Sequence, residues 1–282
     1  MTALVGLIGH PVSHSVSAVF QQAAFDYLGI DARYEPWDTP PAALAARVAA
    51  LRSEPYLGAN VTIPHKEAAL RYVDRADPSV ERTGALNTIV RRDGALEAYN
   101  TDVAGFRRAL AEDAGFRAAG RRAVVLGAGG AARAVVWALA EEKASHVYVW
   151  NRSPERAAAL VASLRAHVRT SHLEAVAAEG LARVLRDCDL LVNSTSVGMR
   201  HSEGEGRLPL PAELIPPRIT VCDVVANPLE TPLLAAARAR RCTVVGGLPM
   251  LVYQGAASFE LWTGVPAPLA VMATAARRAM GE

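Results

Sequence analysis

Lys66 and Asp102 are the residues whose types best fit acid–base chemistry, because one can carry an exchangeable proton and the other can orient it. The chain has 282 residues and 30 basic side chains, of which only Lys66 and Lys143 are lysines. Arginine stays protonated, whereas lysine can exchange a proton when its environment lowers its pKa. An ammonium near a carbonyl oxygen can stabilise negative charge that develops there and deliver a proton. We therefore interpret Lys66 as a candidate catalytic group.

Other polar side chains gather where the predicted strands of the first third end. These segments are 14–17 (with Ser15 and Ser17), 60–66 (with Thr62), 84–88 (with Asn87) and 100–102. Ligands of open α/β sheets bind beyond the carboxyl ends of the strands, so the four segments could line one pocket. Their hydroxyls, amides, ammonium and carboxylate suit a polyhydroxylated anion, since each buried substrate hydroxyl needs a partner.

Each of these residues also has a purely structural alternative. Ser17, Thr101 and Asp102 are good helix N-caps, and Asn87 and Asn100 are ordinary turn residues. Lys66 could be a surface cation in the first turn of a helix. The functional interpretation depends on their joint occurrence.

A glycine-rich segment predicts a nucleotide site. It reads Gly127-Ala128-Gly129-Gly130-Ala131-Ala132, between a predicted strand over 123–126 and a helix over 134–142. This G-x-G-x-x-A pattern permits a tight turn, a close approach of the backbone to a pyrophosphate, and an anion site at the helix N-terminus. The alternative is a tight turn that binds nothing.

The residues after the next predicted strand, 147–150, bear on the choice of cofactor. An NAD enzyme would have a carboxylate there, but this chain has Asn151, Arg152 and Ser153, with Arg156 one turn further on. An arginine pairs with a 2′-phosphate, so the segment predicts NADP(H). The alternative is a solvated helix start.

The elements that must position these groups alternate between strands and helices, which indicates an α/β fold. The first module is predicted to have strands over 4–9, 34–37 and 58–62 in a largely parallel sheet, helices over 18–28, 42–51 and 64–73, and a hairpin of 87–91 with 96–100. A helix follows from Thr101 or Asp102 to about 113. Further strands are expected over 190–193, 219–224 and 243–245, and final helices over 250–261 and 269–280. We predict a substrate-binding domain over 1–105, a dinucleotide-binding domain over 106–246, and C-terminal helices over 247–282 that return to the first domain.

Composition excludes several classes of protein. The chain is 51% hydrophobic and 21% charged, with a net charge of only +2, which argues against a nucleic-acid partner. The uncharged segment 242–259 is interrupted by Gly246, Gly247, Pro249 and Gln254, so we expect no membrane span. There is no basic region before Arg33, so we expect no secretory signal. The cysteines, Cys188, Cys222 and Cys242, lack metal-site spacing. We expect no metal and a cytoplasmic location.

Taken in order, the motifs resemble those of the shikimate dehydrogenase family over nearly the whole chain. The matching segments are 9–17, 60–66, 84–88, 100–102, 127–132, 151–152, 193–199 and 247–264. The resemblance implies a substrate domain formed by both termini, an inserted Rossmann domain and a cleft between them. It also implies the reversible NADPH-dependent reduction of 3-dehydroshikimate to shikimate, in the biosynthesis of chorismate and aromatic amino acids.

The resemblance also implies roles for individual residues. Lys66 and Asp102 would form the catalytic pair. The residues implied in substrate binding are Ser15 and Ser17 for the carboxylate, and Thr62, Asn87 and Gln254 for ring hydroxyls or neighbouring polar groups. The residues implied in cofactor binding are Gly127, Ala128, Gly129, Gly130, Ala131, Asn151, Arg152, Ser153, Arg156, Thr195 and Gly247.

The chain departs from the family pattern at Ala18, Gln22 and Ala226. Ala226 stands where the family normally has a tyrosine that assists carboxylate binding, and the lost hydrogen bond would cost roughly 1.5–3 kcal/mol. Three alternatives therefore stay open: a quinate dehydrogenase, an aminoshikimate dehydrogenase, or an NADP(H)-sensing Rossmann protein without catalysis. A homodimer is one possible assembly.

Overall fold

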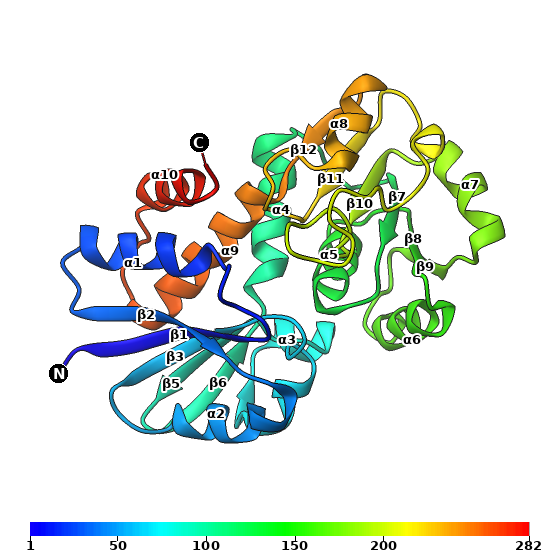
Figure 1. Cartoon of the computed structure of the whole chain (residues 1–282). Coiled ribbons are helices and arrows are strands. Elements are labelled where there is room, and N and C mark those ends of the chain that lie inside the picture. The colour runs from blue at the N-terminus through cyan, green and yellow to red at the C-terminus, as the bar shows by residue number, and fades with distance from the viewer. Residues whose placement is uncertain (282) are drawn as a thin grey trace. The chain divides into compact units, whose positions relative to one another are not determined.

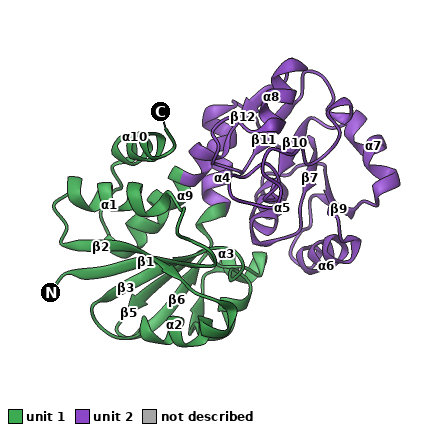
Figure 2. Ribbon diagram, viewed as in Figure 1, with its two compact units in different colours: residues 1–102, 252–282 green, residues 103–251 purple. Residues whose placement is uncertain are grey.

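The computed structural model describes residues 1–281, which form two compact units (Figure 2). Unit 1 contains Met1–Asp102 and the chain from Val252 onward, and unit 2 contains Val103–Leu251. These bounds lie a few residues from the divisions predicted from the sequence. Helices α4 (Thr101–Asp113) and α9 (Gly247–Thr263) contain the two points where the chain passes from one unit to the other.

The sheet of unit 1 has six strands in the order β2-β1-β3-β5-β6-β4. Their bounds are β1 (Ala3–Gly9), β2 (Ala32–Asp38), β3 (Tyr56–Val61), β4 (Arg75–Ala76), β5 (Thr88–Arg92) and β6 (Ala95–Tyr99). β1 pairs in parallel with β2 and β3, whereas β5 is antiparallel to both β3 and β6. The first two predicted βα steps and the predicted hairpin are confirmed, and the antiparallel β5 makes the sheet mixed.

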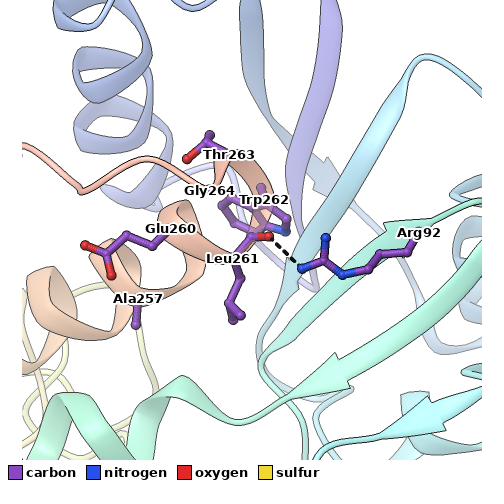
Figure 3. A pocket seen from close by; sticks show the side chains of 7 residues that line it. All are labelled: Arg92, Ala257, Glu260, Leu261, Trp262, Thr263 and Gly264. Atoms are coloured by element: carbon purple, nitrogen blue, oxygen red, sulfur yellow. Dashed lines mark hydrogen bonds between the residues drawn. The ribbon is translucent and has the colours of Figure 1, made fainter.

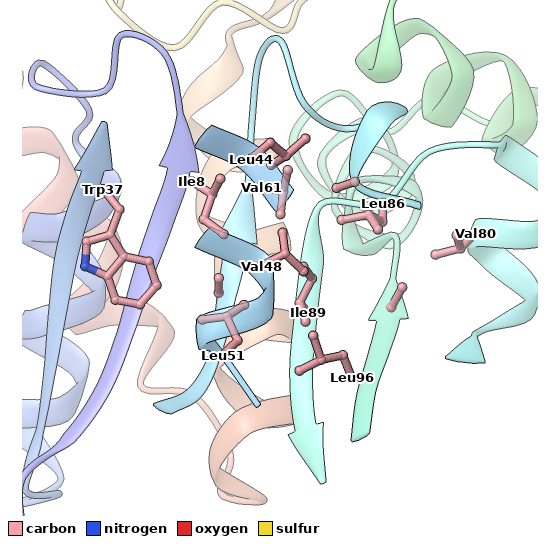
Figure 4. Packing of buried hydrophobic residues seen from close by; sticks show 13 residues of the cluster. Ile8, Trp37, Leu44, Val48, Leu51, Val61, Val80, Leu86, Ile89 and Leu96 are labelled. Atoms are coloured by element: carbon pink, nitrogen blue, oxygen red, sulfur yellow. The ribbon is translucent and has the colours of Figure 1, made fainter. Parts of the chain in front are cut away.

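Helices cover both faces of this sheet (Figure 1). Those of unit 1 are α1 (Ser17–Tyr27), α2 (Leu44–Ala50) and α3 (Pro78–Thr83), together with the later part of α9 and α10 (Leu269–Ala279). On the α2 face, Leu44 and Val48 pack in a dry cluster against Ile8, Val61 and Ile89 (Figure 4). Because side chains alternate along a strand, Asn60 faces the opposite way and meets α9.

Three local predictions in unit 1 were wrong. The segment from Pro64 to Val73 is not an α-helix but turns followed by a 3₁₀ helix over Ala68–Tyr72. Ser17 is the first residue of α1 and not its cap, because Val16 occupies the cap position. Thr101 and Asp102 likewise lie inside the first turn of α4.

Helix α3 was missed, although its local signals are clear. The carboxylate of Asp77 caps it by accepting from the Ser79 N–H at 2.8 Å, and Pro78 opens it. Gly84 ends it with a positive φ of 66°.

Unit 2 has a wholly parallel sheet in the order β12-β11-β10-β7-β8-β9. The strands are β7 (Arg122–Leu126), β8 (His146–Trp150), β9 (His172–Ala175), β10 (Leu190–Asn193), β11 (Thr220–Asp223) and β12 (Thr243–Val245). Along the chain of the unit this is the order 6-5-4-1-2-3 of a doubly wound dinucleotide-binding sheet. The chain reverses direction across the sheet between β7 and β10, which is where such folds bind ligands.

Helices connect these parallel strands. They are α5 (Gly130–Glu141), α6 (Pro154–Arg165), α7 (Ala178–Arg186) and α8 (Pro232–Ala239). The residues Val135, Val136, Trp137 and Leu139 of α5 are all buried, as expected of a helix that is apolar on most sides. Within residues 1–281, no helix is both long enough and apolar enough to span a membrane.

Candidate active site

Lys66 and Asp102 meet in unit 1, with the Lys66 Nζ at 2.5 Å from Asp102 Oδ2. Lys66 follows the carboxyl end of β3, and Asp102 follows β6 in the first turn of α4. The two side chains are 15% and 6% exposed, so the pair is mostly shielded but still reachable from solvent. A shielded ion pair orients the ammonium, as a group that must transfer a proton at a fixed place requires.

Asn87 holds the other oxygen of the same carboxylate. Its amide Nδ2 donates to Asp102 Oδ1 at 2.9 Å, and also lies 3.1 Å from Gln254 Oε1 and 2.8 Å from Thr101 Oγ1. The Thr101 N–H donates to Asn87 Oδ1 at 2.8 Å, which fixes the orientation of the amide because a backbone N–H can only donate. The structure thus brings together Lys66, Asp102, Asn87 and Gln254.

A buried polar cluster lies against Asn87, and the sequence reasoning missed two of its members, Tyr34 and Ser258. It consists of Asn60, Thr88, Thr101 and Ser258, with Tyr34 at its edge. The Tyr34 hydroxyl donates to Asn60 Oδ1 at 2.8 Å, and burial raises the pKa of this phenol, so it keeps its proton. Ser258 could have been found from its spacing, since it lies one helical turn after Gln254 on the same helix face.

The two predicted carboxylate-binding serines lie at the N-terminus of α1. The Ser15 Oγ accepts from the Ser17 N–H at 3.3 Å, and Ser17 is only 8% exposed. The N-terminal N–H groups of a helix and two hydroxyls form a suitable set of donors for a carboxylate. Helix α1 is tied to α9 next to Gln254, because the Gln21 Nε2 donates to the Gly255 carbonyl at 2.9 Å.

Thr62 belongs to the same end of the sheet, directly after β3. Its N–H donates to the Ile8 carbonyl at 2.8 Å, and its side chain is half-buried. This backbone bond fixes Thr62 beside the end of β1, which leads to the loop that carries Ser15.

The glycine-rich segment of unit 2 forms the expected turn between β7 and α5. Gly127 has a φ of 115°, and an added Cβ would lie 2.8 Å from Ser194 Oγ, so no larger residue fits. Gly129 caps α5 without a side-chain hydrogen bond, and nothing lies within 4 Å of the place where its Cβ would be. The open space before uncapped N–H groups fits a phosphate of a dinucleotide.

The remaining predicted cofactor residues are also in unit 2. Arg152 and Arg156 are exposed, and Asn151 Nδ2 donates to the Ser153 carbonyl at 2.9 Å, which shapes the turn after β8. The absence of a carboxylate from positions 151–153, together with the cations at 152 and 156, fits a 2′-phosphate. Thr195 follows β10, and its hydroxyl donates to Asn193 Oδ1 at 2.7 Å. Gly247 begins α9, where an added Cβ would clash at 2.5 Å with the carbonyl of Val224.

Asp223, the last residue of β11, is a buried carboxylate of unit 2 that the sequence analysis did not single out. Burial raises its pKa to about 6, against the lowering effect of hydrogen bonds from Thr231, the Val225 N–H and Asn193. These bonds fix the loop that follows β11 and includes Ala226.

A separate surface hollow lies at the end of α9 (Figure 3). Its lining residues are Arg92, Ala257, Glu260, Leu261, Trp262, Thr263 and Gly264. Its polar groups already bond within the protein, since Arg92 donates to the Leu261 carbonyl at 3.4 Å and Glu260 accepts from the Ala267 N–H at 3.0 Å. It contains none of the predicted site residues. In the part of the chain that the structure describes, no group of three or more His, Cys, Asp or Glu side chains could hold a metal ion.

Comparison with known proteins agrees with this geometry. The profile of the shikimate dehydrogenase substrate binding domain matches residues 7–89, and that of shikimate / quinate 5-dehydrogenase matches residues 109–200. The profile of the shikimate 5'-dehydrogenase C-terminal domain matches residues 247–277. A shikimate dehydrogenase (NADP(+)) of Moorella thermoacetica is 48% identical over 281 residues, which cover 99% of this chain and 94% of that protein. The chain belongs to the shikimate dehydrogenase family.

Solved structures of shikimate dehydrogenases share the fold. Shikimate 5-dehydrogenase of Thermus thermophilus, solved in complex with NADP(H) and shikimate, has a TM-score of 0.87 and 43% identity, over 98% of this chain and 99% of that one. A quinate dehydrogenase of Corynebacterium glutamicum in complex with NAD has the same TM-score of 0.87 at 29% identity, over 97% of this chain and 98% of that one. The predicted family and the predicted α/β fold class are thus confirmed.

Proposed function

We propose that this chain catalyses the reversible NADP(H)-dependent reduction of 3-dehydroshikimate to shikimate, a step in the biosynthesis of chorismate and aromatic amino acids. The observation that carries the proposal is the 2.5 Å contact between Lys66 and Asp102 at the strand ends of unit 1. The contact supports the proposal because an ammonium that is paired with a carboxylate, among hydroxyls and amides that suit a polyhydroxylated acid, can act as a proton donor.

Lys66 acts on the oxygen that changes between carbonyl and hydroxyl. As the carbonyl is reduced, negative charge develops on this oxygen, and the ammonium stabilises the charge and donates a proton. In the reverse direction the neutral amine accepts the hydroxyl proton. Asp102 holds the ammonium in place and accepts a hydrogen bond from the substrate, while Asn87 keeps the carboxylate from rotating.

The remaining residues of unit 1 bind and orient the substrate. Ser15 and Ser17 donate to the carboxylate at the start of α1, where the helix N-terminus favours an anion. Thr62, Asn87 and Gln254 bond ring hydroxyls. Unsatisfied polar groups in a site that excludes water are costly, so this set discriminates between substrates that differ by one hydroxyl.

The cofactor residues belong to unit 2. NADPH, when bound, supplies the hydride. The turn Gly127–Ala131 and the N-terminus of α5 would hold the pyrophosphate, and Asn151, Arg152, Ser153 and Arg156 would hold the ribose 2′-phosphate. Thr195 and Gly247 would complete the site.

We also propose a role for each unit, a cellular location and an oligomeric state. Unit 1 is the substrate-binding domain and unit 2 is the cofactor-binding domain. The free thiols of Cys188, Cys222 and Cys242 fit a reducing cytoplasm. We propose that the protein forms a homodimer, and the mass from analytical ultracentrifugation would test this.

Turnover across a small panel of substrates tests the function. Purified protein is mixed with NADP⁺ or NAD⁺ and with shikimate, quinate or aminoshikimate, and reduced cofactor is measured by its absorbance. The proposal expects the highest kcat/KM for shikimate with NADP⁺. A preference for quinate would favour the second candidate, which Ala226 and the match to a shikimate / quinate profile keep open. Cofactor binding without turnover of any of the three acids would contradict the enzymatic proposal.

A further inference from the structure

The hydroxyl of Ser258 lies at the centre of the buried polar cluster of unit 1. Ser258 has no exposed surface, and its Oγ is 3.0 Å from Asn60 Nδ2, 2.7 Å from Thr88 Oγ1, 3.1 Å from Thr101 Oγ1 and 3.0 Å from the Gln254 carbonyl oxygen. These partners belong to β3, β5, α4 and α9. One small side chain thus joins the four segments that carry the proposed active site.

The chemistry of the partners determines how the protons are shared. The Asn60 Nδ2 group can only donate and the backbone carbonyl of Gln254 can only accept. Ser258 therefore uses one lone pair and its single proton for these two bonds. One lone pair remains, and it accepts from either Thr88 or Thr101. The threonine hydroxyl that does not donate to Ser258 can donate to Asn87 Oδ1, which lies 3.0 Å from Thr88 Oγ1 and 3.1 Å from Thr101 Oγ1.

This sharing connects Ser258 to the carboxylate of Asp102 through Asn87. Oδ1 of Asn87 accepts from the Thr101 N–H and from one threonine hydroxyl, which together fill its two lone pairs. Without Ser258, the threonine hydroxyl that donated to it would turn either to this oxygen, where three donors would compete for two lone pairs, or to the other threonine hydroxyl 3.4 Å away. Either change alters the bonds that hold the Asn87 amide. The amide would then shift, and with it the 2.9 Å bond from Nδ2 to Asp102.

We propose that Ser258 is a positioning residue of the reaction, which orients Asn87, and through it Asp102, without touching the substrate. The inference rests on the proposed function, because it assigns Asp102 to the catalytic pair. Ser258 also donates to the carbonyl of Gln254, which is a proposed substrate contact. The same hydroxyl therefore helps to fix the positions of both Gln254 and the carboxylate of Asp102.

The test replaces Ser258 with alanine and uses Thr263→Ala as the matched control. Thr263 makes the same type of bond on the same helix, since its Oγ1 donates to the carbonyl of Phe259 at 2.8 Å, but it does not contact the cluster. We expect Ser258→Ala to lower kcat for shikimate oxidation about tenfold, while the KM for NADP⁺ stays within about twofold. Thr263→Ala should retain the wild-type kcat. Ser258→Cys fills the same space with a weaker hydrogen-bonding group and should give an intermediate kcat, even if the alanine variant does not fold.

The side-chain amide of Asn87 gives a readout that does not depend on turnover. In protein labelled with ¹⁵N-asparagine, its two N–H resonances are identified by their loss in Asn87→Ala. They should shift in the Ser258 variants and stay in place in Thr263→Ala. Unmoved resonances, or a Ser258→Ala kcat equal to that of the control, would overturn the positioning role. Failure of the wild-type protein to oxidise shikimate would instead contradict the proposed function, and the resonances would still decide whether Ser258 orients Asn87.

Discussion

Asn87 and Lys66 bind opposite oxygens of one carboxylate: the Asn87 amide donates to Asp102 Oδ1 at 2.9 Å, and the Lys66 ammonium donates to Oδ2 at 2.5 Å. With both oxygens held, the carboxylate has a single orientation, and so does the ammonium that it pairs with. Removing one donor should therefore affect the other.

The variant Asn87→Ala should lower kcat as well as weaken substrate binding. A hydrogen bond to a charged group contributes about 1.5–3 kcal/mol, so we expect a roughly ten- to hundredfold loss in kcat/KM for shikimate. The melting temperature should also fall, because the buried Thr101 N–H loses its acceptor. Steady-state kinetics and thermal melts measure both effects. An unchanged kcat/KM in folded protein would show that Asn87 is not needed.

Ser17→Ala should affect substrate binding and leave the chemical step intact. A hydroxyl that bonds the carboxylate equally well in the ground state and the transition state lowers KM without raising kcat. We therefore expect a KM for shikimate raised about tenfold or more at a nearly constant kcat. Ser13→Ala is the control, since Ser13 is exposed in the same loop. Equal KM values for the two variants would argue against a role of Ser17 in carboxylate binding.

Arg152→Ala should reduce the preference for NADP⁺ over NAD⁺. The guanidinium can pair only with the cofactor that carries a 2′-phosphate, so the KM for NADP⁺ should rise about tenfold while that for NAD⁺ stays constant. Arg156→Ala is expected to act in the same direction. Arg183→Ala replaces an exposed arginine on α7 and should leave both KM values unchanged. Parallel loss with both cofactors would contradict a phosphate contact.

The buried carboxylate of Asp223 should make stability depend on pH. Burial raises its pKa from 3.8 to about 6, so between these values the folded protein holds a proton that the unfolded chain has released. The contribution of Asp223 to the free energy of unfolding must therefore decrease as pH rises from about 4 to about 6, by about 3 kcal/mol in total, and stay constant above that range.

Urea unfolding of wild type and Asp223→Asn at several pH values measures this contribution as a difference. The difference should change between about pH 4 and pH 6 and level off above. Asp187→Asn, at an aspartate whose side chain is 68% exposed, should run parallel to wild type. A constant difference between wild type and Asp223→Asn would show that Asp223 titrates alike in both states.

Local patterns in the sequence predicted what depends on local interactions. Most strands of both sheets follow from runs of β-branched or aromatic residues, the hairpin from its turn residues Asp93 and Gly94, and the nucleotide turn from its glycines. The strands β4 and β9 contain no β-branched residue and were not predicted. The contact between Lys66 and Asp102 could be anticipated because both follow strand ends on one side of a sheet.

The helix predicted over 64–73 shows why local patterns fail. In an α-helix the Leu70 N–H would donate to the Lys66 carbonyl, but that carbonyl accepts from the Leu86 N–H at 2.9 Å. Leu70 donates instead to Glu67 at 3.4 Å, and the segment becomes a 3₁₀ helix. A bond to a residue 20 positions away decides the local structure, and periodicity carries no sign of it.

Two members of the buried cluster were missed for a related reason. Tyr34 and Ser258 are far apart in the chain, and each is an ordinary residue for its strand or helix. Their importance comes from Asn60, which the Tyr34 hydroxyl and the Ser258 hydroxyl contact at 2.8 and 3.0 Å. Only the fold brings these side chains into one hydrogen-bonded group.

The most direct test of the account is the kcat of Lys66→Met for shikimate oxidation, measured on protein whose fold and NADPH binding are intact. Lys143→Met is the natural control, because Lys143 is the only other lysine of the chain. We predict that Lys66→Met lowers kcat by about two to four orders of magnitude, as loss of a general acid–base group does, and that Lys143→Met retains the wild-type value. A Lys66→Met enzyme as active as Lys143→Met would contradict the assignment of Lys66 and Asp102 as the catalytic pair.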